Sequence, residues 1–293
     1  AAVTWELLEP EEGVFSFEQT DMLIRTASQH GLNLVVLWFG TWKNGNSHYV
    51  PGWVKRDHAR FRWALSADGT PVRSLSPHCK ATFEADRKAF LALCRHITET
   101  DRDGTVLAIQ IENEPGLIGT MRDHSEEATA LFRAPVPGEV ETLTGKSGTW
   151  EDVYGFYAPE YFTAWHIARY IDDLAVAARE ITSLPFYVNA WLQEMHNRVP
   201  GIDYPSGGAV SRTFSLFKTA TPHIEALAPD IYLQEFQTVE ALHQTYSSMD
   251  NPYYLPETLF SELAMVNAIR GVVRYGLCGV HVFGIDMAID EQE

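Results

Sequence analysis

The chain has 293 residues, of which 45% are hydrophobic and 21% are charged, as in a globular protein that buries a full core. Its 39 Asp and Glu against 22 Lys and Arg give a net charge of −17. Such a surface repels phosphate backbones, so nucleic acid is not an expected partner. The longest apolar run, residues 32–39, is far shorter than the roughly 20 residues of a membrane span.

Short apolar segments alternate with amphipathic segments along the chain, which is the pattern of repeated strand–helix units. Strands are predicted at residues 3–5, 34–39, 106–111, 186–188, 231–233, 253–255 and 280–283. Helices are predicted at residues 17–30, 85–100, 161–181 and 261–275. The first of these helices is followed by Gly31, a residue type that commonly ends helices.

The fold expected from these units is an α/β barrel of the (β/α)8, or TIM-barrel, type. Continuous apolar runs such as residues 34–39 are typical of parallel strands that are buried on both faces. The pattern gives seven strands where a barrel has eight, so we expect a truncated barrel that lacks strand 1 and the last helix. Residues 1–293 are expected to form a single domain.

Three long segments rich in Gly, Pro, Ser, Asn and His follow predicted strands, at residues 40–82, 115–158 and 191–222. In a barrel these segments are loops that connect strands to helices on the C-terminal face. Active sites are built on that face, so we expect the functional residues there.

Two acidic positions stand out because each follows an apolar strand. Glu112 and Glu114 flank Asn113 after the strand at 106–111. Alternation would point both glutamates one way and Asn113 the other, unless the strand end twists or bulges. Glu257 follows the strand at 253–255, three barrel strands later. The alternative for each position is a solvated acid in a turn or at a helix N-terminus.

Together the two positions indicate a specific chemistry. Strands 4 and 7 lie across a barrel mouth from each other, so Glu114 and Glu257 can converge on one bound bond. Hydrolysis of a glycosidic bond needs one proton donor and one carboxylate that attacks or supports the anomeric carbon. A neighbouring anionic carboxylate raises the pKa of the donor and keeps it protonated.

At these residues the chain resembles the clan of barrel glycosidases whose acid/base ends strand 4 and whose nucleophile ends strand 7. Within this clan it is most similar to glycoside hydrolase family 35, the β-galactosidases, over nearly the whole chain. The resemblance rests on a strand-2 segment at 3–17, a Glu-Asn-Glu signature within 110–116 and a nucleophile strand at 255–257. The segment at 37–45 suggests a bacterial branch of the family.

The resemblance implies a retaining glycoside hydrolase that cleaves terminal β-galactosides, with Glu114 as acid/base and Glu257 as nucleophile. It implies that Asn113 hydrogen-bonds the sugar 2-hydroxyl and that Tyr232 holds or donates to Glu257. Glu112 is not assigned to the catalytic pair. Indole faces pack well on sugar rings. The candidates for the sugar-binding wall are Trp5, Glu6, Trp38, Trp42, Asn189 and Trp191.

The stretch after strand 3 departs from the family pattern. Family members carry Cys-Ala-Glu or Asn-Ala-Glu there to bind galactose hydroxyls, whereas this chain has Trp42-Lys43-Asn44. Lys43 and Asn44 are candidates to bind hydroxyls instead, and the sugar stays open. The alternatives are an exo-β-glycosidase of other sugar specificity and a catalytically silent carbohydrate-binding barrel.

Other chemistries are not indicated by any motif. The sequence has no His-Glu-x-x-His, no Gly-x-Ser-x-Gly and no Gly-x-Gly-x-x-Gly. Gly145-Lys146-Ser147 matches the end of a P-loop motif, but the motif also requires a glycine at position 140, where this chain has Val140. We expect no metal and no cofactor, with an oligosaccharide or polysaccharide side chain as the substrate. The cysteines at 79, 94 and 278 are expected to be structural thiols. A secreted or periplasmic location would suit such a substrate, but no residue indicates the compartment or the oligomeric state.

Overall fold

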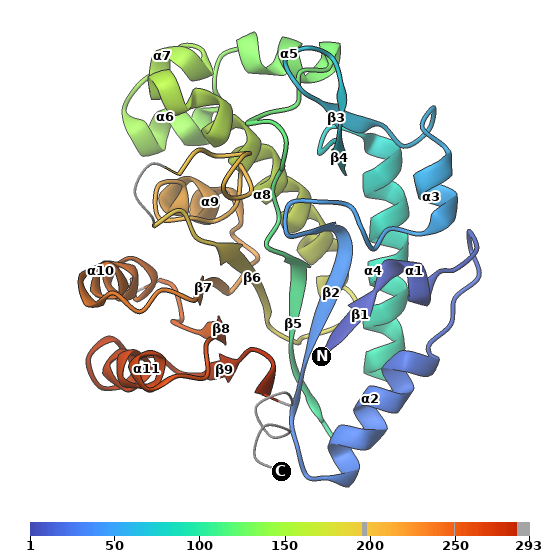
Figure 1. Cartoon of the computed structure of the whole chain (residues 1–293). Helices are drawn as coiled ribbons and strands as arrows, with labels where there is room; N and C mark the ends of the chain where they lie inside the picture. Colours follow the sequence, from blue (N-terminus) through green and yellow to red (C-terminus); the bar gives the residue numbers. More distant parts are fainter. Residues whose placement is uncertain (195–197, 249, 286–293) are drawn as a thin grey trace.

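The computed structural model describes residues 1–194, 198–248 and 250–285. Its seven-stranded sheet is parallel throughout, in the order β1-β2-β5-β6-β7-β8-β9, and curves with helices along its outer face (Figure 1). These strands are β1 (Ala2–Thr4), β2 (Leu34–Lys43), β5 (Val106–Asn113), β6 (Phe186–Trp191), β7 (Ala226–Ile231), β8 (Leu255–Thr258) and β9 (Val280–Val282). Within the described residues no pairing joins β1 to β9, so the sheet is an open part of a barrel.

The five long helices of the strand–helix units are α2 (Glu18–Gln29), α4 (Lys80–Thr100), α8 (Ala158–Arg179), α10 (Phe236–Tyr246) and α11 (Glu262–Tyr275). Four of the five overlap the predicted helices, with α4 beginning five residues before the predicted start at 85. Gly31 follows α2 with a φ of 64°, and Ser261 caps α11 by accepting a hydrogen bond from the Ala264 N–H. Of these helices, only α10 was not predicted. None of the described helices combines the length and the apolarity that a membrane span requires.

The three long segments after the strands contain ordered elements that the sequence did not predict. The first holds α3 (Gly52–Arg56) and the antiparallel hairpin of β3 (Trp63–Leu65) and β4 (Pro71–Leu75). The second holds α5 (Glu126–Arg133), α6 (Gly138–Thr144), α7 (Trp150–Tyr154) and η1 (Gly155–Tyr157), and the third holds α9 (Phe214–Ala220). Helices α5 to α7 and the hairpin gather at the top of the view in Figure 1.

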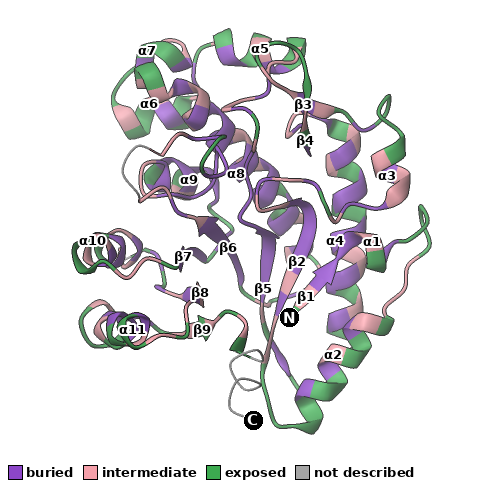
Figure 2. Ribbon diagram, viewed as in Figure 1, coloured by how far each residue is buried: buried purple, intermediate pink, exposed green. Residues whose placement is uncertain are grey.

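Alternate residues of the strands pack into two different clusters of buried side chains, one on each face of the sheet. One set packs outward against the helices, as Val36, Ile109 and Val188 do. The other set, with Tyr187 and Ala228 at its centre, packs on the inner face of the curved sheet. The central strands are therefore buried on both faces, which explains their continuous apolar runs (Figure 2).

Three predicted strand boundaries are wrong. Trp5 begins the short helix α1 (Trp5–Leu8) instead of ending β1. The strand predicted at 231–233 lies earlier, because residues 226–231 are all buried and the Pro229-Asp230 pair sits inside β7. The strand predicted at 253–255 begins only at its last residue, so Glu257 lies within β8.

The side chain of Asn251, just before β8, is hydrogen-bonded to the start of β7. Its buried side chain accepts a hydrogen bond from the Leu227 N–H (2.8 Å) and donates to the carbonyls of Leu227 (3.0 Å) and Tyr246 (2.8 Å). These contacts satisfy backbone groups that the parallel sheet leaves open at this point.

We predict that Asn251→Ala lowers the free energy of unfolding by about 2–3 kcal/mol, because buried backbone groups lose their partners. Urea unfolding of the two proteins measures this difference. Asp250→Ala is the control, since Asp250 is exposed, and it should change the value by less than about 0.5 kcal/mol. Equal effects of the two substitutions would contradict the role of Asn251.

Candidate active site

The backbone leaves regular strand geometry at the end of β5. Glu112 and Glu114 have φ angles of 63° and 47°, a left-handed conformation that non-glycine residues adopt only at a cost. This conformation breaks the alternation that would place both glutamates on one side. Asn113 and Glu114 both lie beside Glu257, whereas Glu112 turns towards β2.

Glu112 fixes the end of β2. Its buried carboxylate accepts hydrogen bonds from the backbone N–H groups of Thr41 (3.0 Å) and Trp42 (2.6 Å). The buried carboxyl of Asp86 lies next to it and accepts from the Thr41 hydroxyl (2.7 Å). Burial, and then the charge on Asp86, raises the pKa of Glu112, and burial raises the pKa of Asp86. Glu112 therefore supports the backbone at β2.

The end of β2 is bonded to the residues that carry the site. Lys43 is in register with Asn113, and the Asn44 N–H donates to the Asn113 carbonyl (3.0 Å). The Asn44 side chain donates to the Glu114 carboxylate, and the Gly45 N–H donates to the Glu114 carbonyl (3.1 Å). Lys43 and Asn44, predicted to bind sugar hydroxyls, thus lie next to the predicted acid/base.

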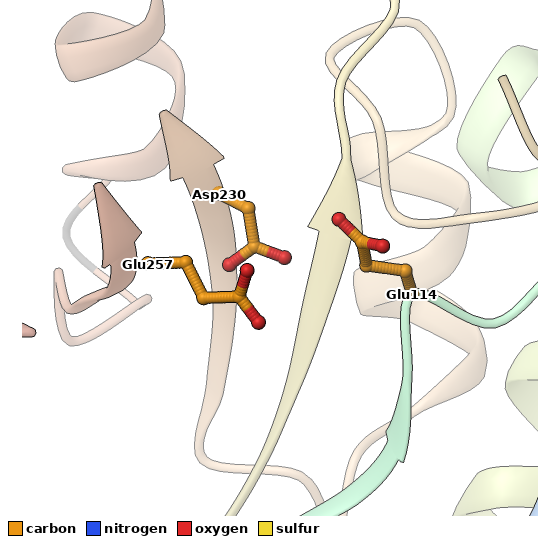
Figure 3. A group of neighbouring side chains, drawn as sticks. All are labelled: Glu114, Asp230 and Glu257. Carbon is orange, nitrogen blue, oxygen red and sulfur yellow. The ribbon is translucent and has the colours of Figure 1, made fainter. Parts of the chain in front are cut away.

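Three carboxyl groups converge at the ends of β5, β7 and β8. Glu114, Asp230 and Glu257 each bring one oxygen within 4.8 Å of the other two (Figure 3). Asp230 and Glu257 are neighbours in the register of β7 and β8. Glu114 and Asp230 are buried and Glu257 is half-buried. The structure therefore brings together the two glutamates that the sequence singled out.

Polar side chains hold these carboxyls in place. The Tyr232 hydroxyl donates to one oxygen of Glu257 (2.5 Å), and the Asn113 amide donates to the other (3.5 Å). Asn189 bridges the two buried acids, because it accepts from the Glu114 N–H (2.7 Å) and donates to Asp230 (2.7 Å). Asn113, Tyr232 and Asn189 therefore all lie at the acids, and of their expected contacts the structure shows the one from Tyr232 to Glu257.

The electrostatics distinguish the three acids. Burial, and then the charge on Glu257, raises the pKa of Glu114 to about 7, against the opposing effects of Asp230, Lys43 and Asn44. Burial, and then the charges on Glu257 and Glu114, raises the pKa of Asp230 well above its usual range. Burial, and then the hydrogen bond to Glu257, raises the pKa of Tyr232. Glu114 can therefore hold a proton near neutral pH.

The predicted sugar-binding wall is only partly at the acids. Trp5 and Trp42 are fully buried, and their indole N–H groups donate to Glu9 and to the Leu75 carbonyl, so neither offers a face to a sugar. Trp38 is buried in the same way against Asp86 (2.9 Å), and Glu6 pairs with Lys55 (3.2 Å). Trp191 ends β6 in register with Asp230, beside the acids.

Asp230 was missed by the sequence analysis, which began the predicted strand one residue after it, at 231. A signal was present, because Asp230 is an acid inside the apolar stretch 226–231 and stands two residues before Tyr232. Among the described residues, Glu114, Asp230 and Glu257 form the group of carboxylates close enough to share a metal ion. The expectation of a metal-free site stays a prediction.

Comparison with known proteins gives a family match over most of the chain. The model of glycoside hydrolase family 42, described as β-galactosidase, matches residues 1–198. The chain is 26% identical to a β-galactosidase of an Arthrobacter species over 205 residues, which are 61% of this chain and 28% of that protein. It is 27% identical to a β-galactosidase of Halorubrum lacusprofundi over 165 residues, which are 54% of this chain and 22% of that protein.

Solved structures share the fold at low identity. The β-galactosidase of the psychrophilic Marinomonas ef1 superimposes with a TM-score of 0.68 at 12% identity, over 96% of this chain and 49% of that one. The β-galactosidase of Bacillus circulans sp. alkalophilus gives 0.67 at 12% identity, over 96% of this chain and 45% of that one. The chain thus spans about half the length of these solved chains. The predicted α/β, TIM-type partial barrel is confirmed.

The resemblance to family 35 is corrected by the match to family 42. The physical reason lies in the residues on which the resemblance rested. An acid/base that ends strand 4 and a nucleophile that ends strand 7 are shared by a whole clan of retaining barrel glycosidases, so these positions identify the clan and the chemistry before they identify one family. The clan remains consistent with family 42.

Gly40 packs directly against the buried acid pair behind the site. A Cβ atom at residue 40 would lie 2.8 Å from a carboxyl oxygen of both Asp86 and Glu112, and 2.3 Å from the Trp38 indole nitrogen. We predict that Gly40→Ala lowers the free energy of unfolding by about 1–3 kcal/mol, because these buried groups have no room to move aside.

Thermal or urea unfolding tests this prediction against Gly138→Ala. Gly138 begins α6 and a Cβ atom there meets nothing within 4 Å, so this control should lose little stability. A loss of the same size in both variants, or in neither, would contradict the packing at Gly40.

Proposed function

The chain belongs to glycoside hydrolase family 42, and we propose that it hydrolyses terminal β-galactosides with retention of configuration, using Glu114 as acid/base and Glu257 as nucleophile. The observation that carries this proposal is the convergence of these carboxyls, whose oxygens approach within 4.8 Å. Retaining glycosidases place their two carboxyl groups about 5–5.5 Å apart, whereas inverting enzymes leave about 6.5–9.5 Å for a water molecule.

In the first step, ionised Glu257 attacks the anomeric carbon while Glu114 gives its proton to the departing glycosidic oxygen. The new bond joins a Glu257 oxygen to the sugar, and the leaving group departs as a neutral alcohol. The Tyr232 hydroxyl and the Asn113 amide orient Glu257 for this attack. Asn113 is also placed to hydrogen-bond the sugar 2-hydroxyl, an interaction that strengthens as positive charge develops on the ring.

In the second step, ionised Glu114 takes a proton from water, which attacks the anomeric carbon and releases Glu257. Two inversions restore the starting configuration. The change in role of Glu114 follows from its surroundings. The charge on Glu257 helps to raise the pKa of Glu114, and that charge disappears when Glu257 forms the ester. The pKa of Glu114 then falls, and the group becomes a base.

The β-galactoside specificity is supported by the relatives, which are named β-galactosidases. Lys43 and Asn44 lie beside Glu114 and supply donors for sugar hydroxyls. We place the substrate among oligosaccharides or polysaccharide side chains that end in β-galactose. The β-glucoside of the same leaving group is the comparison that tests the sugar.

The catalytic assignment predicts different products from two variants. With a nitrophenyl β-galactoside, proton NMR should show the β-anomer as the first product. Glu257→Ala and Glu114→Ala should each lower kcat by about 10²–10⁴-fold. Added azide should yield the α-galactosyl azide from the Glu257 variant and the β-galactosyl azide from the Glu114 variant, because azide replaces the nucleophile in one and attacks the ester in the other.

Glu126→Gln is the matched control, since Glu126 is an exposed glutamate at the start of α5. It should retain the activity of the unchanged chain. A first product with the α configuration, or full activity in either alanine variant, would refute the proposed double displacement.

The pH dependence follows from the state of Glu114. Because Glu114 must be protonated to act as the acid, kcat/KM should fall as the pH rises through about 7, the pKa of this group. A pH profile of kcat/KM measures this alkaline limb. Asn44→Ala removes a hydrogen bond to the ionised form of Glu114, so its limb should move to higher pH. A limb that moves to lower pH would show that another group is the acid.

A further inference from the structure

Asp230 is a third carboxyl that a two-glutamate double displacement does not use. It lies between Glu114 and Glu257 at the end of β7 and is buried (Figure 3). Its Oδ2 atom accepts a hydrogen bond from Asn189, whereas its buried Oδ1 atom has no hydrogen-bond partner among the described residues. A buried carboxyl oxygen without a partner is energetically costly unless it binds a cation or carries a proton that it donates.

The contacts of Asn189 show where a proton on Asp230 resides. The Glu114 N–H can only donate, so the Asn189 atom that it meets at 2.7 Å is the amide oxygen. The amide nitrogen of Asn189 therefore faces Asp230 and donates to Oδ2 (2.7 Å). Since Oδ2 is the acceptor, a proton held by Asp230 lies on Oδ1, the atom without a partner.

The groups that face Asp230 favour its neutral form. They are carboxyls and phenols: Glu114, Glu257, Tyr187, Tyr232, Tyr246 and Tyr254. An ionised Asp230 would be a buried anion beside Glu257, with no basic side chain among these described neighbours to offset it. Burial and the two glutamate charges raise the pKa of Asp230. After burial and the charge on Glu257, the interaction with Asp230 lowers the pKa of Glu114, as expected when Asp230 is the donor.

We propose that Asp230 is a neutral positioning residue whose Oδ1 proton is donated in a hydrogen bond to whichever glutamate carries the negative charge. This inference rests on the proposed function. In the free enzyme the charge is on Glu257, and in the glycosyl-enzyme it is on Glu114. One oxygen of Asp230 lies within 4.8 Å of an oxygen of each glutamate. Asp230 keeps its proton throughout, so it forms and breaks no covalent bond.

In the proposed reaction the negative charge moves from one glutamate to the other, and a donor beside both can stabilise it in either place. Forming the ester neutralises Glu257, and releasing the proton ionises Glu114, so one negative charge crosses the space beside Asp230. A buried donor beside both glutamates stabilises the anion as it develops, with only the direction of its hydrogen bond changing. Hydrogen bonds to charged groups are about twice as strong as neutral ones.

The protonation of Asp230 is measured without turnover. Infrared difference spectra of the chain and Asp230→Asn, recorded at pH 7, should show a protonated carboxyl band that the variant lacks. Carbon NMR of the chain labelled at aspartate carboxyls should show an aspartate other than the buried Asp86 that stays protonated through neutral pH, with Asp86→Asn identifying the signal of Asp86. This measurement does not depend on the folding of the Asp230 variant. An aspartate set that, apart from Asp86, is fully ionised at pH 7 overturns the proposal.

Kinetics of Asp230→Ala and Asp230→Asn test the role of the donor. Loss of the donor in Asp230→Ala should lower kcat about 10-fold or more. It should also move the alkaline limb of kcat/KM to higher pH, because above this limb Glu114 of the free enzyme is ionised too and loses the hydrogen bond through which Asp230 lowers its pKa. Asp230→Asn retains a neutral donor and should recover most of that loss, with the limb in place.

If Asp230 instead carries a charge, both variants remove an anion beside Glu114, and the limb moves to lower pH in both. That result, or a loss of kcat in both variants with no movement of the limb, overturns the proposal. A chain that hydrolyses no β-galactoside while Asp230 stays protonated contradicts the proposed hydrolase function and leaves the protonation of Asp230 standing.

Discussion

The site depends on the left-handed backbone at Glu112 and Glu114, which the surrounding contacts must hold in place. A regular strand would send these two glutamates to the same side, since side chains alternate with a period of two. Here Glu112 binds two N–H groups at the end of β2, and the Glu114 N–H is bound by Asn189. Left-handed residues of this kind cost about 1–3 kcal/mol each and persist where their surroundings over-determine them.

The same contacts connect the buried Glu112 to Glu114 through the end of β2. Because Glu112 holds Thr41 and Trp42, the next residues of β2 reach Glu114, and Asn44 donates to its carboxylate. The buried acids Asp86 and Glu112 therefore stand behind the site without entering it. A change to this pair would act on Glu114 through the backbone, whereas a change at Tyr232 would act directly on Glu257.

The raised pKa values in the acid cluster follow from burial and from neighbouring negative charge. Burial and the charge on Glu257 raise the pKa of Glu114 to about 7, and burial with the charges on both glutamates raises the pKa of Asp230 well above its usual range. Glu257 has the hydroxyl of Tyr232 and the amide of Asn113 as donors. The proposed reaction moves a single charge between positions that already have donors, which limits the reorganisation that the site must undergo.

The sequence by itself determined the strand–helix repeat, the parallel sheet and the two glutamates at strand ends, because burial on both faces leaves continuous apolar runs and strand ends carry the exposed chemistry. It could not determine the boundaries of β7 and β8. In β7, Pro229 and Asp230 are buried inside the strand against their local preference. The tertiary structure alone decided that Trp5 and Trp42 lie in the core and that Asp230 joins the acids. Local sequence sets which side chains can be buried, but only the register of neighbouring strands sets which of them meet.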